Sequence, residues 1–188
     1  MKDDVFIRGK TPMTKEEVRA VALDKLQLKG AKRFLDVGAG TGSVSIQAAA
    51  RYPNLAVTAL ERNEEALELI QLNKSKFALG NIEIISAYAP IMLSHSYDAI
   101  FIGGSGGKLA EIIEWSHNLL LPDGRLVLNF ILLENLQEAL NLLDDQKWSE
   151  IETVMLQASK LMKLGNGSFF KPQNPTYIIS CCKKREEY

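Results

Sequence analysis

Short apolar blocks alternate with amphipathic stretches along most of the chain, and the two patterns predict different elements. Mostly apolar blocks of strand length occupy residues 33–37, 55–60, 82–85, 97–102 and 125–130. Helical periodicity fills the intervals, after residue 14 and over residues 44–49, 64–77, 109–121 and 134–145. Strands that alternate with helices are connected by right-handed crossovers and form a parallel sheet. The pattern therefore predicts an α/β fold.

Two of these helices carry more detailed predictions. For the first, Thr14 is a candidate N-cap and Glu17 stands three residues later, as in a capping box. For the helix over residues 64–77, four apolar residues are expected at inward positions. They are Leu67, Ile70, Leu72 and Phe77.

The alternation ends after residue 134, where the helix is followed by two strand patterns at residues 149–158 and 176–183. The segment 165–173 between them is rich in turn residues and is predicted to be a long loop. Without an intervening helix, the two strands are expected to form an antiparallel hairpin over 149–183 at the sheet edge. The adjacent Cys181 and Cys182 would then face opposite sides of a strand as ordinary strand residues. We expect one domain over 1–188, in which residues 1–30 form an N-terminal segment and helix.

Composition adds mainly exclusions. The chain has 22 basic and 23 acidic residues and a net charge of −1, which gives no overall field to attract nucleic acid. The N-terminus lacks the apolar core of a signal peptide, and no apolar run approaches the ~20 residues that span a bilayer. We therefore expect a cytoplasmic protein with no nucleic-acid or membrane partner. No cluster of ligand residues predicts a metal site.

A glycine-rich turn follows the first strand and carries the clearest chemistry. Gly38, Gly40 and Gly42 let the backbone turn sharply and let a ligand lie against it. A dinucleotide site prefers Gly-x-Gly-x-x-Gly, with a pyrophosphate at the helix N-terminus. Here the spacing is shorter, and Asp36 would repel pyrophosphate but suit the ammonium group of S-adenosylmethionine. Glu61, at the end of the second strand, is placed to accept hydrogen bonds from both ribose hydroxyls.

Five stretches carry a resemblance to known enzymes: residues 35–42, 60–63, 8–20, 101–107 and 129–135. The first two resemble class I methyltransferases in general. The others resemble the cobalt-precorrin-6B C-15-methyltransferase (decarboxylating) family of cobalamin biosynthesis. The resemblance implies a Rossmann-like, mostly parallel seven-stranded sheet with an antiparallel edge hairpin, and S-adenosyl-L-methionine as methyl donor. It also implies a tetrapyrrole substrate, methylated at the C-15 meso carbon and decarboxylated at the C-12 acetate, and a homotetramer.

Together, the residues and the resemblance assign a cofactor site. It comprises Thr14, Asp36, Gly38, Ala39, Gly40, Thr41, Gly42, Glu61, Tyr88 and Ala89. Tyr88 stands where the family usually has an acidic residue near the adenine, and we expect it to stack on or flank that ring. The substrate cleft candidates follow the fourth and fifth strands, and no catalytic residue is assigned among them. They are Gly103, Gly104, Ser105, Gly106, Gly107, Asn129 and Glu134.

The implied chemistry needs few reactive side chains, because a sulfonium methyl is already activated and an electron-rich meso carbon needs no strong base. His95 and His117 are accordingly predicted to be structural or surface residues. Decarboxylation is hypothesised to use the macrocycle itself as electron sink. Basic residues are natural partners for the substrate carboxylates. The candidates are Arg8, Lys10, Lys15, Arg19, Lys160, Lys163 and Lys171.

Alternatives remain open at this stage. The chain could methylate another small molecule, an RNA or a protein, or bind S-adenosylmethionine without catalysis. The string Asn174-Pro175-Thr176-Tyr177 resembles an amino-methyltransferase motif but precedes the last strand, which predicts a strand-entry turn. The edge hairpin carries apolar residues that are candidates for a subunit interface by analogy. They are Val154, Met155, Leu156, Leu161 and Met162.

Overall fold

The computed structural model describes residues 1–143 and 146–185. A 3₁₀ turn, η1, spans Asp3–Val5. The helices are α1 Glu16–Lys25, α2 Ser43–Arg51, α3 Glu64–Lys76, α4 Leu109–Leu119 and α5 Leu133–Leu143. The strands are β1 Arg33–Val37, β2 Ala56–Glu61, β3 Ile82–Ser86, β4 Tyr97–Ile102, β5 Leu120–Phe130, β6 Trp148–Leu156, β7 Ser159–Leu164, β8 Gly167–Pro172 and β9 Thr176–Lys183.

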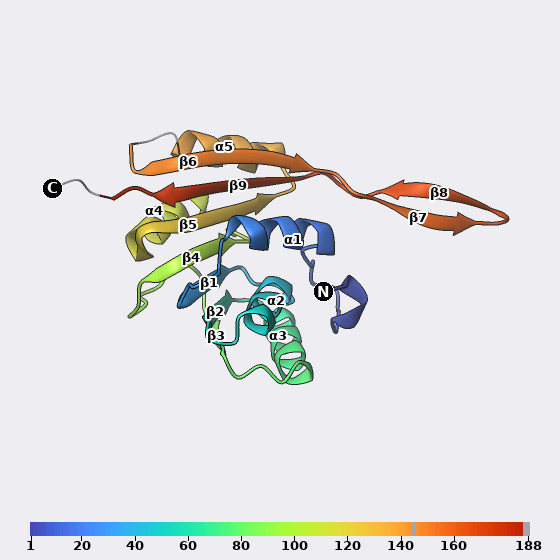
Figure 1. Ribbon diagram of the computed structural model, residues 1–188, viewed down its shortest axis with the longest axis horizontal. Coiled ribbons are helices and arrows are strands. Elements are labelled where there is room, and N and C mark those ends of the chain that lie inside the picture. Colours follow the sequence, from blue (N-terminus) through green and yellow to red (C-terminus); the bar gives the residue numbers. More distant parts are fainter. Residues whose placement is uncertain (144–145, 186–188) are drawn as a thin grey trace.

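Seven strands form one sheet in the order β3-β2-β1-β4-β5-β9-β6 (Figure 1). The pairs among β1 to β5 are parallel, whereas β9 is antiparallel to both β5 and β6. The predicted α/β sheet with an antiparallel edge is therefore confirmed. The chain adds β2 and β3 on one side of β1 and then crosses to add β4 and β5 on the other side, so the strand order reverses at β1. Such switch points open crevices at the carboxyl ends of the strands.

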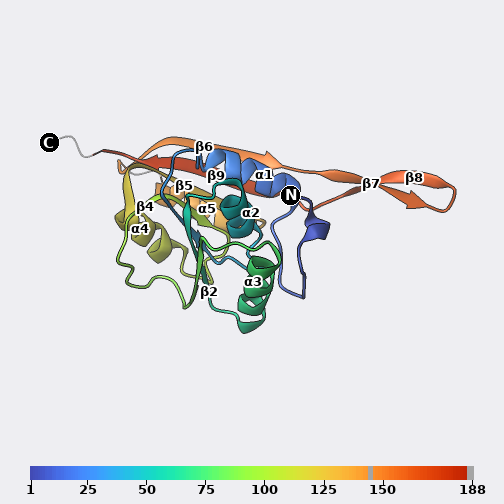
Figure 2. The same cartoon turned by 60° about the horizontal axis from the view of Figure 1, so that its bottom comes forward.

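Helices cover both faces of the sheet, and each face has its own hydrophobic core. Residues of α1 and α2 pack with Phe34 and Phe101 on one face, where α3 also lies. Residues of α4 and α5 pack with Leu35 and Ile100 on the other (Figure 2). Phe34 and Leu35 are consecutive and completely buried, as expected for a parallel strand covered on both sides. Among the described residues, no helix is long and apolar enough to cross a membrane.

The predicted cap of the first helix is wrong. The N-cap residue of α1 is Lys15, and its side chain makes no capping hydrogen bond. The carbonyl of Thr14 instead accepts a hydrogen bond from the Arg19 guanidinium, and the Glu17 carboxylate pairs with Lys160 at 3.1 Å. The two residues of the predicted capping box thus have separate partners, and that of Glu17 is distant in the sequence.

The inward face of α3 matches the prediction only in part: Ile70 is buried and Phe77, directly after the helix, packs against the core. Leu72 is 50% exposed, while the buried positions are Ala66, Leu69, Ile70 and Asn73. A pattern that counts only apolar residues misses Asn73, which is completely buried because its amide finds backbone partners.

Strand β5 begins earlier than residue 125, because Leu120 already pairs with Tyr97 before a register shift. Helix α4 correspondingly ends at Leu119 rather than at residue 121. Helix α5 begins at Leu133, and the predicted end at residue 145 lies outside the described residues. The vicinal cysteines do face opposite sides: Cys181 lies in a core cluster, whereas Cys182 accepts a hydrogen bond from Arg125.

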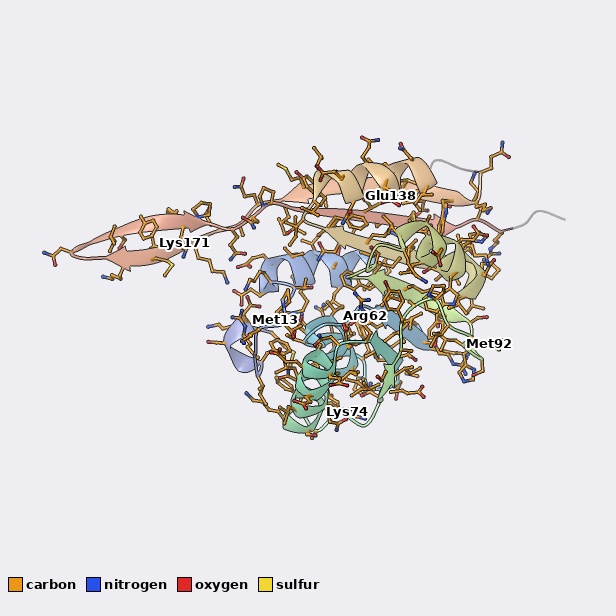
Figure 3. All side chains as sticks on the ribbon, turned by 180° about the vertical axis from the view of Figure 1, so that it is seen from behind. Met13, Arg62, Lys74, Met92, Glu138 and Lys171 are labelled. Carbon is orange, nitrogen blue, oxygen red and sulfur yellow. The ribbon has the colours of Figure 1, made fainter. Side chains whose placement is uncertain are left out.

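The predicted long loop at residues 165–173 is wrong, because β7 and β8 form an antiparallel ribbon that we call the arm (residues 159–172). Gly165, at φ 57°, and Asn166 make a two-residue turn between the paired Leu164 and Gly167. The turn-rich composition therefore marks the tip of a hairpin. The arm projects from the edge where the parallel strands end, and its side chains stand out on both faces (Figures 1 and 3).

Candidate functional site

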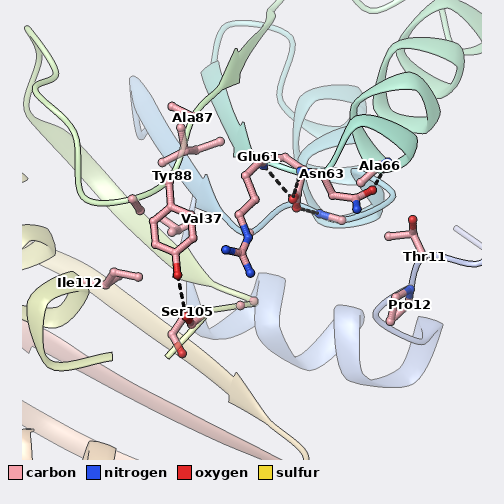
Figure 4. A pocket seen from close by; sticks show the side chains of 18 of the residues that line it. Thr11, Pro12, Val37, Glu61, Asn63, Ala66, Ala87, Tyr88, Ser105 and Ile112 are labelled. Atoms are coloured by element: carbon pink, nitrogen blue, oxygen red, sulfur yellow. Dashed lines mark hydrogen bonds between the residues drawn. The ribbon is translucent and has the colours of Figure 1, made fainter. Parts of the chain in front are cut away.

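A cavity of about 510 Å³ lies at the carboxyl ends of the parallel strands, within the range of small-molecule sites. It is lined by the N-terminal segment, by the ends of β1 and β2, by the loops after β1, β2, β3 and β4, and by residues of α3 and α4. Its wall includes Lys10, Thr11, Pro12, Gly38, Gly40, Glu61, Arg62, Asn63, Glu65, Tyr88, Ala89, Gly103, Gly104, Ser105 and Gly106. Thr11 and Pro12 lie on one side of the cavity, and Tyr88 and Ile112 lie on the other (Figure 4).

The loops after β1 and β4 meet closely at the base of the cavity. Gly38 has φ +69°, and a Cβ there would lie 2.7–2.9 Å from backbone atoms of Gly104. The amide of Gly103 donates to the Val37 carbonyl at 2.9 Å, which fixes the second loop against the first strand. A side chain at position 38 would therefore separate the two loops.

Glu61 organises the upper rim through its own carboxylate. One oxygen accepts the amides of Arg62 and Asn63 at 2.8 and 2.9 Å, and the other accepts the Gly40 amide at 2.9 Å. Because each carboxylate oxygen has two lone pairs, one lone pair remains, on the oxygen that accepts the Gly40 amide, and it can accept a ligand hydroxyl. Glu61 thus ties the end of β2 to the glycine loop while lining the cavity.

Asp36 lies behind the glycine loop and does not line the cavity. It is completely buried, and one carboxylate oxygen accepts from the Ser45 amide and hydroxyl at 3.1 and 2.5 Å. The other oxygen has no hydrogen-bond partner among the described residues. Burial, aided by the charge of Glu61, raises the pKa of Asp36 to about 7 despite the opposing Ser45 hydrogen bonds.

Tyr88 bridges the cavity from the loop after β3 to the loop after β4. Its hydroxyl donates to the Gly106 carbonyl at 2.6 Å. The Arg62 guanidinium lies 4.3 Å from the ring centroid, and the Lys108 ammonium lies 5.1 Å from it. Gly106, at φ +58°, leaves room for this contact, because a Cβ there would lie 2.9 Å from the Tyr88 hydroxyl.

The structure brings about half of the sequence-derived site residues to the cavity wall. Among the cofactor candidates, Gly38, Gly40, Glu61, Tyr88 and Ala89 line it, as do Gly103, Gly104, Ser105 and Gly106 among the cleft candidates. The others lie off the wall: Thr14, Asp36, Ala39, Thr41, Gly42, Gly107, Asn129 and Glu134. The loop predicted to line the substrate cleft therefore shares one cavity with Glu61 and Tyr88.

The basic residues predicted to meet substrate carboxylates also divide into those on the cavity wall and those away from it. Lys10 lines the cavity, whereas Arg19 is completely buried and bonded within the protein, so the prediction that it meets a substrate carboxylate is wrong. Lys160 pairs with Glu16 and Glu17. Sequence reasoning missed Arg62, whose position directly after Glu61 at a strand end was the available signal.

Neither histidine lines the cavity. His95 borders a separate hollow beside the starts of β2 and β3, and the His117 ring packs edge-on against Trp148. The described part of the chain contains no cluster of three or more His, Cys, Asp or Glu able to hold a metal ion.

We expect Tyr88→Phe to loosen the loop at residues 103–107 without unfolding the protein. Loss of one hydrogen bond corresponds to ~1 kcal/mol, so amide exchange in this loop should rise roughly five- to tenfold. Hydrogen-exchange mass spectrometry measures this. Tyr97→Phe, which removes a 3.4 Å contact to Thr58, is the control and should leave the loop unchanged. Equal exchange in the Tyr88 variant and the parent would refute the bridge.

Asp36 should make the stability of the fold depend on pH. Its pKa is 3.8 ordinarily and about 7 when folded, so between these values the folded protein holds a proton that the unfolded chain has released. The stabilisation is complete below the lower value and is lost as pH rises through the higher one. From pH 5 to pH 8, the parent should lose roughly 3 kcal/mol of unfolding free energy relative to Asp36→Asn.

Urea unfolding at the two pH values measures this difference. Asp98→Asn, which alters a half-buried carboxylate at the other end of the sheet, should keep the parental pH dependence. If the unfolding free energy of Asp36→Asn depended on pH as strongly as that of the parent, the assignment of this dependence to Asp36 would be contradicted.

Comparison with known proteins points to one class of enzyme. A family model described as "Precorrin methyltransferase domain" matches residues 4–183. The chain is 51% identical to a curated cobalt-precorrin-6B C(15)-methyltransferase (decarboxylating) from Salmonella typhimurium, over 98% of this chain and 96% of the relative.

Two solved structures extend the similarity to three dimensions. A precorrin-6y C5,15-methyltransferase from Geobacter metallireducens superposes with a TM-score of 0.91 at 39% identity, covering 97% of this chain and 96% of the other. A precorrin-8w decarboxylase from Methanobacterium thermoautotrophicum gives 0.85 at 30% identity, covering 96% and 98%.

Proposed function

The chain belongs to the precorrin methyltransferase family, and we propose that it methylates the C-15 meso carbon of cobalt-precorrin-6B and decarboxylates the C-12 acetate. S-adenosylmethionine would be the methyl donor and anaerobic cobalamin biosynthesis the pathway. The observation that carries this proposal is the 51% identity to the Salmonella relative across nearly the whole chain. A net charge of −1 agrees with a small-molecule substrate and no nucleic-acid partner.

The residues around the cavity fit S-adenosylmethionine. Gly38 and Gly40 line the cavity with backbone alone, so a ligand can lie directly against the loop, and a Cβ at Gly40 would lie 3.2 Å from the Pro12 carbonyl. Asp36 lies behind the glycine loop, with one oxygen that has no hydrogen-bond partner among the described residues, and a cation bound nearby would favour its carboxylate form over the protonated form. Glu61 would accept a hydrogen bond from a ribose hydroxyl with its remaining lone pair. Tyr88 would flank the adenine at the far side of the cavity, with the Arg62 guanidinium against its ring.

When bound, S-adenosylmethionine supplies a methyl group activated by a sulfonium centre. The protein's task is then to hold donor and acceptor carbon in line and to exclude water. The loop at residues 103–107 presents bare backbone beside the cavity, which lets a flat macrocycle approach closely. No histidine is needed as a base, in agreement with the positions of His95 and His117 away from the cavity.

Decarboxylation is proposed to need no dedicated side chain, because the conjugated macrocycle can accept the electron pair released with carbon dioxide. The protein would contribute by desolvating the reacting carboxylate. Single substitutions on the cavity wall that abolish carbon dioxide release but preserve methylation would overturn this idea.

The remaining substrate carboxylates need cationic partners, and two now stand out. Lys10 and Arg62 line the cavity on different segments. Lys163 and Lys171 lie on the arm, where they could reach only a substrate or subunit near that ribbon. Arg8 and Lys15 flank the wall residues Lys10, Thr11 and Pro12 in the sequence and do not line the cavity themselves.

Mass spectrometry of products tests the proposed reaction directly. Purified protein incubated anaerobically with S-adenosylmethionine and cobalt-precorrin-6B should convert the substrate to a species that has gained one methyl group and lost one carbon dioxide. Omitting S-adenosylmethionine is the control. An unchanged tetrapyrrole, with cofactor binding verified separately, would leave the acceptor to be found among other small molecules, RNA or proteins.

We also propose that the protein is a homotetramer in which the arm makes subunit contacts. An isolated two-stranded ribbon is marginal in water, and this one exposes Leu161, Leu164 and Phe170 by 63, 71 and 67%. Met155 and Met162, predicted from the sequence as interface residues, are also exposed, whereas Val154 and Leu156 pack partly on the core.

The double variant Leu161→Lys/Phe170→Lys, which alters one cross-strand pair of the arm, should lower the mass of the assembly in light scattering. Burying two lysines against apolar partners is unfavourable. Met92→Lys, at a 98% exposed position away from the arm, is the control and should keep the parental mass. A monomeric parent would remove the proposal.

A further inference from the structure

The N-terminal segment forms one wall of the cavity although it has almost no regular structure of its own. We call residues 1–15 the strap. Apart from the short turn η1, no hydrogen-bonded ladder fixes it. Its residues Lys10, Thr11 and Pro12 nevertheless line the cavity, with Pro12 against Gly40 of the glycine loop. The position of this wall must therefore depend on side-chain contacts from other elements.

Asn73 of α3 connects the strap to the glycine loop. Its side-chain oxygen accepts the Ile7 amide at 2.8 Å, and its amide nitrogen donates to the carbonyls of Ile7 and Thr41 at 3.1 and 3.2 Å. Both amide hydrogens and one oxygen lone pair are thus used, and the side chain is completely buried. One side chain therefore sets the spacing between the two backbones.

Arg19 of α1 holds the two ends of the strap. Its guanidinium donates to the carbonyls of Met1 and Thr14 and pairs with Asp3 at 3.2 Å, while its Nε donates to Gln47 of α2. It also lies 4.8 Å from the centroid of the Phe6 ring. A completely buried guanidinium is costly unless its donors are paired, so the strap ends are held firmly around it.

Two peripheral contacts complete the attachment. The Lys10 amide donates to Glu65 at 2.9 Å, and the Lys76 ammonium donates to the Val5 carbonyl at 2.7 Å. Glu65 and Lys76 belong to α3, as does Asn73. The strap thus follows α3 along its middle and closes on Arg19 at its ends, so that its inner edge faces the glycine loop.

We propose that Asn73 and Arg19 are positioning residues of the cofactor site, which hold the strap at the distance from the glycine loop that a nucleoside ligand requires. Neither residue lines the cavity, so each acts through the strap. This inference rests on the proposed function for the identity of the ligand.

The decisive variant is Asn73→Asp, which keeps the shape of the side chain, removes both donors and directs a carboxylate at two carbonyls. Its matched control is Asn81→Asp. The Asn81 amide also donates to backbone carbonyls, those of Ala49, Tyr52 and Leu55 at 3.3, 3.3 and 2.9 Å, but beside the opposite end of the sheet. Both variants should lower the thermal midpoint for the same physical reason.

Only the Asn73 variant should lose ligand affinity. Calorimetric titration with S-adenosylhomocysteine should give a dissociation constant raised on the order of tenfold or more for Asn73→Asp, and within about twofold of the parent for Asn81→Asp. Hydrogen exchange without ligand should rise at residues 4–13 and 38–42 together in the Asn73 variant only. Parental affinity in Asn73→Asp, or equal losses in both variants, would overturn the proposal.

Two further outcomes are distinguishable. If Asn73→Asp does not fold, the variant Gln47→Leu replaces it. This change removes one hydrogen-bond acceptor of Arg19 at a residue outside the cavity wall. Parental ligand affinity in Gln47→Leu would count against the proposal. If the parent itself fails to bind S-adenosylhomocysteine, the proposed function fails. In that case the exchange data still decide whether Asn73 holds the strap to the loop.

Discussion

The close contact between the turns after β1 and β4 is the constraint on which the site depends. At Gly38 the backbone passes so near Gly104 that no side chain fits between them. The two loops therefore converge at the point where strand order reverses, and the space above them becomes the cavity. A parallel sheet supplies this geometry without any reactive residue, which suits a reaction governed by orientation.

The sheet supplies only part of the cavity, and buried polar groups supply the rest. Arg19 and Asn73 are completely buried, yet their hydrogen-bonding groups meet backbone atoms of a segment that has little regular structure. Such groups are expensive to bury unless they are paired, so they impose one arrangement on the strap. Asp36 is different, because one oxygen has no hydrogen-bond partner among residues 1–143 and 146–185 and burial raises its pKa to about 7.

The arm leaves the sheet at the same end of the molecule as the cavity. Strands β5 and β6 point in the same direction, because β9 lies between them and is antiparallel to both. The ribbon that follows β6 therefore leaves at the carboxyl ends of the parallel strands. Lys160, at its base, pairs with Glu16 and Glu17 of α1, directly after the strap. A contact between subunits through the arm would therefore act close to the cavity.

The sequence by itself determined the order of strands and helices, the turn at Gly38, Gly40 and Gly42, and Glu61 at its rim. These features follow from the local periodicity of apolar residues and from the need for glycine where the backbone turns sharply. Only the tertiary structure decided that Arg19 is internal, that Asn73 rather than Leu72 faces inward, and that residues 159–172 form a ribbon. Each of these depends on partners distant in the sequence, and a buried polar side chain carries no local sign of the carbonyl that it will meet.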